Sequence, residues 1–291
     1  MFKPPVSPYL VPFDGSFHVG KGGSQVPKII PPKKECNDQL LILGYELDEL
    51  QRMLYAHDRY ALLIIFQAMD AGGKDSTIRA VMSRVNPAGC QVFTFKQPSS
   101  LSLDHDFLWR TTRCLPERGR IGIFNRSYYE EVLIVRVHPE LLQKQKLPQP
   151  LNVRKLWPQR YESIRNHEKH LAHNGTVILK FWLNVSKQEQ KKRFLSRLSE
   201  PEKNWKFSAA DLEERKLWGK YMKAYEAALR ATSRPWAPWY AIPADDKPYM
   251  RMCVAEIIVK TLRNLRLGYP TVTKGQKAQF SKLQKKLEKA N

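Results

Sequence analysis

The sequence predicts an α/β protein in which helices cover both faces of a doubly wound parallel sheet. Short apolar runs of strand length alternate with longer segments of helical periodicity, an arrangement typical of this class. The clearest run, Ala61–Gln67, is almost entirely apolar, as expected of a parallel strand buried on both faces. The 291 residues, of which 42% are hydrophobic, can supply a core large enough for such a sheet.

Five strands are expected in chain order. The first is followed by a glycine-rich turn and a helix, and the second and third are separated by a further helix, which favours parallel pairing. The predicted strands are Ala61–Gln67, Gln91–Phe95, Arg120–Phe124, Thr176–Leu183 and Trp239–Ile242.

Helices are expected where apolar residues recur at three- and four-residue spacing. The first follows Asn37 and Asp38, either of which could cap it. A later one should end near Asn174–Gly175, where glycine supplies a left-handed cap. The remaining predicted helices are about Lys74–Val85, Leu103–Leu115, Leu151–Leu171, Lys187–Leu198, Ala210–Ala231 and Lys247–Arg266.

Composition suggests three parts of the chain. Residues 1–37, rich in Pro, Gly and Lys, should form an extended arm that either wraps around the protein or stays free. Residues 38–268 should form the folded domain. The Lys-rich residues 269–291 are expected to be a solvated tail, with a fraying helix as the alternative.

The charge balance indicates an acidic partner. The chain has 49 Lys and Arg against 28 Asp and Glu, a formal net charge of +21. Such an excess favours nucleic acid, an anionic membrane or a multiply charged phosphate compound. The longest apolar run, Ala61–Phe66, is far shorter than the roughly 20 residues that span a bilayer, and we see no export signal. We therefore expect a cytoplasmic protein with no membrane partner.

The segment Ala68–Thr77 (AMDAGGKDST) lies between a predicted strand and a predicted helix, where a phosphate-binding loop belongs. Gly72 and Gly73 would let the backbone turn its N–H groups inward without interference from a side chain. The helix N-terminus would add partial positive charge, and Lys74 would reach back over the phosphate oxygens. A tight strand-to-helix turn is the structural alternative, but the two flanking elements favour a phosphate site.

This loop departs from the usual pattern G-x-x-x-x-G-K-[ST] at two positions. Ala68 replaces the first glycine, and Asp75 stands where Ser or Thr would bind the metal. The loop also contains Asp70, a carboxylate that ordinary loops of this kind lack. We interpret Asp70 as a group that coordinates Mg²⁺ or guides a phosphate acceptor.

Polar side chains follow the third predicted strand, in the segment FNRSYYEEV. Ligands collect at the carboxyl ends of parallel strands near the switch in strand order, so Asn125 and Arg126 should lie across from Lys74. An arginine there could hold a transferring phosphoryl group and neutralise charge in the transition state. Glu130 and Glu131 could bind a metal or contact an acceptor, or could be a solvated helix start.

Basic residues outnumber acidic ones between residues 187 and 206. Arg193 and Arg197 are four residues apart and share one helix face. In kinases with a phosphate-binding loop, a helical lid brings arginines over the phosphates and excludes water. We expect such a lid over about residues 187–225, although a basic helix can also be a solvated face.

Seven segments together resemble the polyphosphate kinase 2 family, in matching order and spacing from about residue 38 to 268. They are AMDAGGKD, FKQPS, HDFLWR, FNRSYYEEVLIVRVHPE, SEPEKNWKF, DLEERKLW and APWYAIPAD. The resemblance implies a P-loop kinase fold similar to thymidylate kinase, with a helical lid. It implies reversible, Mg²⁺-dependent transfer of phosphate between inorganic polyphosphate and a nucleotide.

The resemblance also assigns roles to residues of this sequence. Catalysis would use Asp70, Lys74 and Arg126, with Asp70 as the metal ligand. Polyphosphate would contact Gly72, Gly73, Lys74, Asp75, Arg193, Arg197 and Lys206. The nucleotide would contact Arg110, Asn125, Arg126 and Glu130.

One position departs from many members of that family. Asn125 stands where others carry an aspartate, and with Glu130 it is similar to the subgroup that accepts nucleoside monophosphates as well as diphosphates. This shifts the metal role towards Asp70 and places Glu130 near the acceptor phosphate.

Two other functions remain as alternatives. One is an ATP-dependent nucleoside monophosphate kinase, but the basic lid and Asp70 argue against it. The other is a nucleic-acid-binding protein, for which we find no aromatic RNA-binding pattern and no zinc finger. The expected partners are polyphosphate and the purine nucleotides AMP, ADP and ATP, with no nucleic acid, and the expected assembly is a homodimer or homotetramer.

Overall fold

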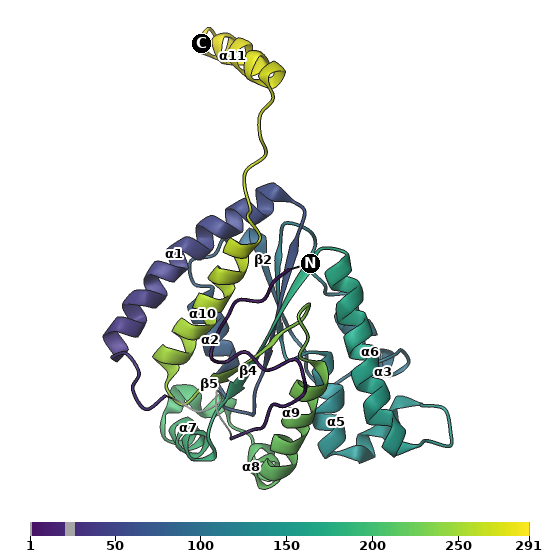
Figure 1. The fold of residues 1–291 in the computed structure, drawn as a ribbon. Coiled ribbons are helices and arrows are strands. Elements are labelled where there is room, and N and C mark those ends of the chain that lie inside the picture. The colour runs from purple at the N-terminus through teal and green to yellow at the C-terminus, as the bar shows by residue number, and fades with distance from the viewer. Residues whose placement is uncertain (1, 21–26, 291) are drawn as a thin grey trace.

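In the computed structural model, which describes residues 2–20 and 27–290, five parallel strands form one sheet in the order β2-β3-β1-β4-β5 (Figure 1). The chain starts the sheet at its centre and then crosses to either side, as a doubly wound sheet does. The strands are β1 Ala61–Gln67, β2 Cys90–Thr94, β3 Ile121–Asn125, β4 Thr176–Asn184 and β5 Trp239–Pro243. The predicted fold class is confirmed, and each predicted strand lies within one or two residues of its observed bounds.

Helices cover both faces of the sheet (Figure 1). Helices α1, α2 and α10 pack on one face, and α5, α6 and α9 lie on the other. The α-helices are α1 Lys33–His57, α2 Lys74–Val81, α3 Ser100–Leu103, α4 Trp109–Thr112, α5 Ile134–Val137, α6 Val153–His173, α7 Lys187–Ser199, α8 Ala210–Lys216, α9 Trp218–Thr232, α10 Lys247–Asn264 and α11 Lys274–Glu288. Short 3-10 helices are η1 Pro87–Gly89, η2 Tyr128–Val132, η3 Pro139–Gln145 and η4 Pro201–Lys206. No helix in residues 2–20 and 27–290 is long and apolar enough to cross a membrane.

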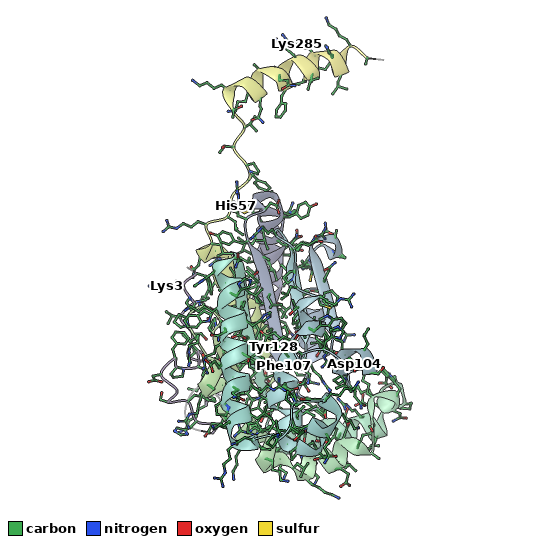
Figure 2. All side chains as sticks on the ribbon, turned by 90° about the vertical axis from the view of Figure 1, so that its right-hand side faces the viewer. Lys3, His57, Asp104, Phe107, Tyr128 and Lys285 are labelled. Carbon is green, nitrogen blue, oxygen red and sulfur yellow. The ribbon has the colours of Figure 1, made fainter. Side chains whose placement is uncertain are left out.

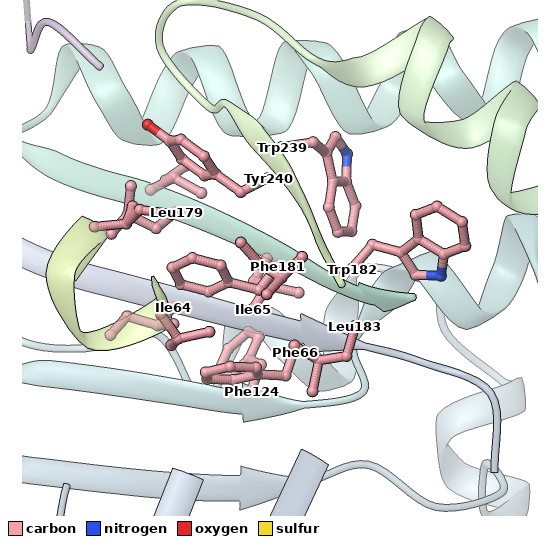
Figure 3. Packing of buried hydrophobic residues seen from close by; sticks show 14 of the residues in the cluster. Ile64, Ile65, Phe66, Phe124, Leu179, Phe181, Trp182, Leu183, Trp239 and Tyr240 are labelled. Atoms are coloured by element: carbon pink, nitrogen blue, oxygen red, sulfur yellow. The ribbon is translucent and has the colours of Figure 1, made fainter. Parts of the chain in front are cut away.

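The central strands form the middle of the core. Every residue of β1 is buried, and β4 is buried from Val177 to Leu183. Figure 3 shows Phe66 of β1 near Phe181 of β4, and these rings stack with their centroids 5.3 Å apart. Burying such side chains contributes about 1.5–3 kcal/mol each to folding. This packing makes the sheet a rigid base for the loops at its carboxyl end.

The N-terminal arm lies against the edge of the sheet. Leu10 forms an antiparallel bridge to Tyr240 of β5, and Tyr9 and Val11 are buried. An exposed edge strand is a template for unwanted pairing, so this contact protects β5. Of the predicted arm, Met1 and residues 21–26 lie outside the described residues.

The first helix begins earlier than predicted. It starts at Lys33, so Asn37 and Asp38 lie inside it and do not cap it, and residues 33–37 do not belong to the arm. The reason is Cys36, which is fully buried and adds an apolar position one turn before the leucine stripe.

Two other predicted helices are divided. The segment 103–115 contains the last residue of α3 and the single turn α4, because the Asp106 carboxylate accepts a hydrogen bond from the Leu108 backbone N–H at 2.9 Å and starts a new turn. The segment 210–231 is broken at Leu217, where ψ is 12° and the backbone leaves the helical region.

The C-terminal segment forms helix α11, the alternative raised from the sequence, and the described residues of this helix are all exposed to solvent. Thr273 and Gln276 form a capping box at the start of α11. Phe280, Leu283 and Leu287 recur at helical spacing but remain exposed. Figure 2 shows Lys285 on this helix, well away from the body of the protein.

Candidate active site

The predicted phosphate-binding loop connects β1 to α2 at the carboxyl edge of the sheet. Gly73 is the N-cap of α2 and has φ +100°, a conformation that residues with a side chain rarely adopt. At Gly72 a Cβ atom would lie 2.6 Å from the Ala68 Cβ and 2.8 Å from the Met69 carbonyl oxygen. Both glycines are therefore needed for this turn, as predicted.

Replacing Gly72 by alanine should displace the loop and lower kcat by about 10²-fold, the typical cost of a misplacement of about 1 Å at a reacting centre. Steady-state kinetics would measure the loss. Gly219→Ala on α9 is the matched control, because a Cβ there meets nothing within 4 Å. Equal activity of Gly72→Ala and Gly219→Ala would contradict a shape-critical loop.

Lys74 is the cation of the loop. Its side chain is buried, and Nζ donates a hydrogen bond to the Ala68 carbonyl oxygen at 2.9 Å. Burial lowers the pKa of Lys74, and the neighbouring Arg126 lowers it further. A phosphate anion bound in the loop would stabilise the charged form of Lys74, and the charged lysine would in turn stabilise the bound phosphate.

Asp70 and Arg126 meet at the carboxyl edge of the sheet, so Arg126 lies beside the loop that contains Lys74, where the strand-end argument places it. An Arg126 guanidinium nitrogen lies 3.0 Å from the Asp70 carboxylate. Arg126 has φ +64°, a left-handed conformation that costs about 1–3 kcal/mol and persists where surrounding structure demands it. Its backbone N–H donates to the Phe66 carbonyl oxygen at 3.0 Å, which ties the strained residue to β1.

Glu130 lies in η2, which begins two residues after Arg126. Burial raises the pKa of Glu130, although Arg126 and Lys74 oppose the shift. A carboxyl group poised in this way beside two cations suits an acceptor-binding or proton-handling role.

Asn125 has a partner that its position in the sequence did not reveal. Its side-chain amide donates a hydrogen bond to the Asp75 carboxylate at 2.6 Å. An aspartate at position 125 would face Asp75 with like charge, so the asparagine accommodates the unusual acid of the loop. Asn125 is buried at the end of β3, and its amide faces the loop.

Two side chains of α7, the first helix of the predicted lid, donate hydrogen bonds to the backbone of the phosphate-binding loop. Arg193 is 8% exposed and donates to the Ala71 carbonyl oxygen at 3.0 Å and to the Ala244 carbonyl oxygen at 2.5 Å. Gln190, one turn earlier, donates to the Asp70 carbonyl oxygen at 2.9 Å. Sequence reasoning missed Gln190, whose only signal is its place one turn before Arg193.

Arg197 and Lys206 lie further from the loop contacts. Arg197 pairs with Asp211 at 3.3 Å and donates to the backbone of Lys206 at 3.2 Å, so it connects α7 to α8 and η4 within the predicted lid. The Lys206 ammonium is exposed and lies 4.9 Å from the centre of the Trp205 ring. Neither side chain forms a hydrogen bond or ion pair with loop residues 68–75.

A pocket of about 380 Å³ is lined by Arg126, the residue that pairs with Asp70 of the loop. It is bordered by Arg126 and Glu130 on one side and by Arg110 and Phe95 on another, with the Arg110 guanidinium 5.6 Å from the centre of the Phe95 ring. Three of the predicted nucleotide-binding residues thus line one cavity, and Asn125 does not. A smaller cavity of about 130 Å³ shares Arg110 with it and extends towards Phe107 and Tyr128, which Figure 2 labels on the same side of the protein.

The described residues contain no cluster of three His, Cys, Asp or Glu side chains that could hold a metal ion alone. The loop nevertheless offers two hard oxygen donors, the partly exposed Asp70 and the exposed Asp75. Phosphoryl-transfer sites commonly hold a divalent ion with one or two carboxylates together with substrate phosphates and water. The donor set fits an ion shared with a phosphate substrate and does not fit an all-protein cage.

Comparison with known proteins matches residues 32–267 to a family model described as polyphosphate kinase 2. The chain is 54% identical over 272 residues to the ADP-polyphosphate phosphotransferase of Rhodopseudomonas palustris, covering 93% of this chain and 94% of that one. It is 47% identical over 238 residues to the AMP/ADP-polyphosphate phosphotransferase of Meiothermus ruber, covering 82% and 85%. The crystal structure of polyphosphate kinase 2 from Arthrobacter aurescens TC1 superposes with a TM-score of 0.85 at 35% identity, covering 97% of this chain and 98% of that one.

Proposed function

Because the chain belongs to the polyphosphate kinase 2 family, we infer that it transfers phosphate reversibly between inorganic polyphosphate and a nucleotide. The observation that carries this function is the ion pair between Asp70 of the loop and Arg126, which itself lines the pocket together with Glu130. The buried loop cation Lys74 interacts electrostatically with all three of these residues. A phosphate chain held at the loop would then present its terminal phosphoryl group to an acceptor in that pocket.

Positioning and charge neutralisation would supply most of the catalysis. The loop N–H groups and Lys74 would hold the donor phosphates, and Arg126 would bridge the transferring group and the acceptor. Glu130 would orient the acceptor phosphate or accept its proton. Gln190 and Arg193 would act indirectly, by fixing the carbonyl groups of the loop.

The polyphosphate path is proposed to run from Gly72, Gly73, Lys74 and Asp75 along the lid, towards Arg197 and Lys206. Polyphosphate carries about one charge per unit and no bases, so its recognition must be electrostatic and sensitive to salt, as for nucleic-acid backbones. The formal charge of +21 supports this.

We propose Mg²⁺ as the metal, held by Asp70 with Asp75 nearby and with the substrate phosphates. Magnesium would supply neutralisation of the phosphate charge during transfer. Asp70 would also keep Arg126 in place through their 3.0 Å ion pair.

Asp70→Asn should lower kcat by about 10²-fold or more and raise the Mg²⁺ concentration needed for half-maximal activity. A magnesium titration at saturating substrates would measure both effects. Asp38→Asn, at an exposed position of α1, is the matched control. An unchanged magnesium requirement in Asp70→Asn would remove Asp70 from the metal site.

A matrix of donors and acceptors tests the function itself. Polyphosphate or ATP would be offered as donor, with AMP or ADP as acceptor, and nucleotide products would be separated by chromatography. Phosphorylation of AMP and ADP from polyphosphate is expected. Activity with ATP alone as donor would favour the nucleoside monophosphate kinase, and tight sequence-dependent gel shifts would favour nucleic-acid binding.

Acceptance of both AMP and ADP is part of the proposal, as is self-assembly. Helix α1 exposes Leu41, Ile42, Tyr45 and Tyr55, an apolar surface that supports a homodimer or homotetramer. Light scattering at several concentrations would give the assembly mass.

A further inference from the structure

His138 lies between two carboxylates at the rim of the acceptor pocket. Its Nδ1 is 3.1 Å from the Glu140 carboxylate in η3, and its Nε2 is 3.0 Å from the Glu214 carboxylate in α8. A neutral imidazole has one N–H group, so only the protonated ring can donate to both carboxylates at once. The geometry therefore calls for a charged His138.

These two contacts join different parts of the protein. His138 and Glu140 belong to the wall of the acceptor pocket, whereas Glu214 belongs to the predicted lid, and all three line the pocket. His138 is thus the side chain through which this wall of the pocket holds α8.

Charged and polar groups from other elements also face this site. The Tyr221 hydroxyl of α9 donates to the Glu214 carboxylate, and Lys220 attracts Glu140. Arg126 and Glu130 face the same pocket from the β3 side. Partial burial lowers the pKa of His138, but its hydrogen bonds to Glu214 and Glu140 outweigh burial and raise the pKa above its ordinary value.

We propose that protonated His138 is a positioning residue that latches lid helix α8 to the wall of the acceptor pocket and so keeps water out during transfer. The inference rests on the proposed function. It adds that the latch favours the nucleotide over water as the acceptor of the phosphoryl group. When His138 loses its proton, one ring nitrogen presents a lone pair to a carboxylate, and the latch loosens.

The pH dependence follows from the raised pKa. The latch is complete below the ordinary histidine value of about 6.5 and is lost as pH rises through the raised value. With the lid loosened, water can attack the terminal phosphorus: its oxygen forms the new P–O bond, the bridging P–O bond breaks, and a shortened polyphosphate leaves while a proton goes to solvent. Hydrolysis should therefore rise relative to transfer as pH increases.

The test uses the full chain with polyphosphate, Mg²⁺ and ADP from about pH 5.5 to 9, the range over which a histidine titrates. Two quantities would be measured: the KM for ADP, and the ratio of orthophosphate released to ATP formed. In the wild type both should rise about 3- to 10-fold across the pH step, the effect of losing one hydrogen bond. In Glu214→Gln and His138→Gln, the KM for ADP and the ratio of orthophosphate to ATP should be high at every pH and should not change with pH.

His170→Gln is the matched control, because His170 is exposed on α6, away from the pocket. It should keep the wild-type step. If Glu214→Gln showed the same pH-dependent rise in KM and in the hydrolysis ratio as the wild type, the latch would be overturned. It would also be overturned if Glu214→Gln or His138→Gln lowered thermal stability and left KM and the hydrolysis ratio unchanged. Absence of ADP phosphorylation in the wild type would instead overturn the proposed function.

Discussion

Lys74→Ala is expected to lower kcat/KM for polyphosphate-dependent phosphorylation by at least about 10²–10³-fold, the usual cost of removing one preorganised group that stabilises transition-state charge. Lys74 is the cation of the loop, and it is buried 2.9 Å from a loop carbonyl oxygen. No solvent molecule can replace a fixed charge at that place. Initial rates with polyphosphate and ADP would measure the loss.

Lys260→Ala provides the matched control. Lys260 is partly exposed on α10 and lies away from the loop, and it pairs with Glu256 on the same helix at 2.7 Å. Its removal should leave the rate unchanged, since exposed pairs of this kind contribute little. Full activity in Lys74→Ala with a normal circular dichroism spectrum would disprove the mechanism.

Lys180 and Glu168 form a fully buried ion pair, 2.7 Å apart, on which the stability of the fold depends. The Lys180 ammonium also donates to the Tyr129 hydroxyl at 2.8 Å and to the Thr232 carbonyl oxygen at 2.9 Å. Glu168 accepts hydrogen bonds from the hydroxyls of Tyr128 and Tyr129, each at 2.9 Å. This network lies beneath η2, so it supports the segment that carries Glu130.

Lys180→Met should lower the free energy of unfolding by about 3–5 kcal/mol, because it leaves the Glu168 carboxylate buried without a counter-charge. Burial lowers the pKa of Lys180 to about 8, although Glu168 opposes the shift. Burial likewise raises the pKa of Glu168. The desolvation of both charges is therefore large, and each is stable only while its partner is present. Urea unfolding followed by fluorescence would measure the change.

The double variant Lys180→Met with Glu168→Gln separates pairing from packing. It removes both charges but keeps an oxygen that can accept from Tyr128 and Tyr129, so it should be more stable than Lys180→Met alone. If the two substitutions instead destabilised additively, the ion pair would not be the source of the effect.

The strongest local patterns were enough to predict much of the fold and part of the site. The apolar run of β1 and the glycines before Lys74 identified the sheet and its phosphate-binding loop. The rule that ligands gather at the carboxyl ends of parallel strands placed Arg126 opposite that loop, and the Asp70–Arg126 distance of 3.0 Å agrees. Element bounds were less accurate where a single residue decides them, as at Cys36 and Leu217.

What the sequence by itself determined is therefore the loop at Ala68–Lys74, because its chemistry depends on neighbours within a few residues. Tertiary structure alone decided which distant groups come together around the site: Gln190 donates to the loop backbone, His138 meets Glu214 of α8, and Lys180 meets Glu168. In sequence each of these is one polar residue among many on a helix or strand. Only the packing of those elements shows which polar atoms face each other. Spacing along the chain indicates the side of a helix or strand on which a residue lies, but it does not identify the residue's partner on another element.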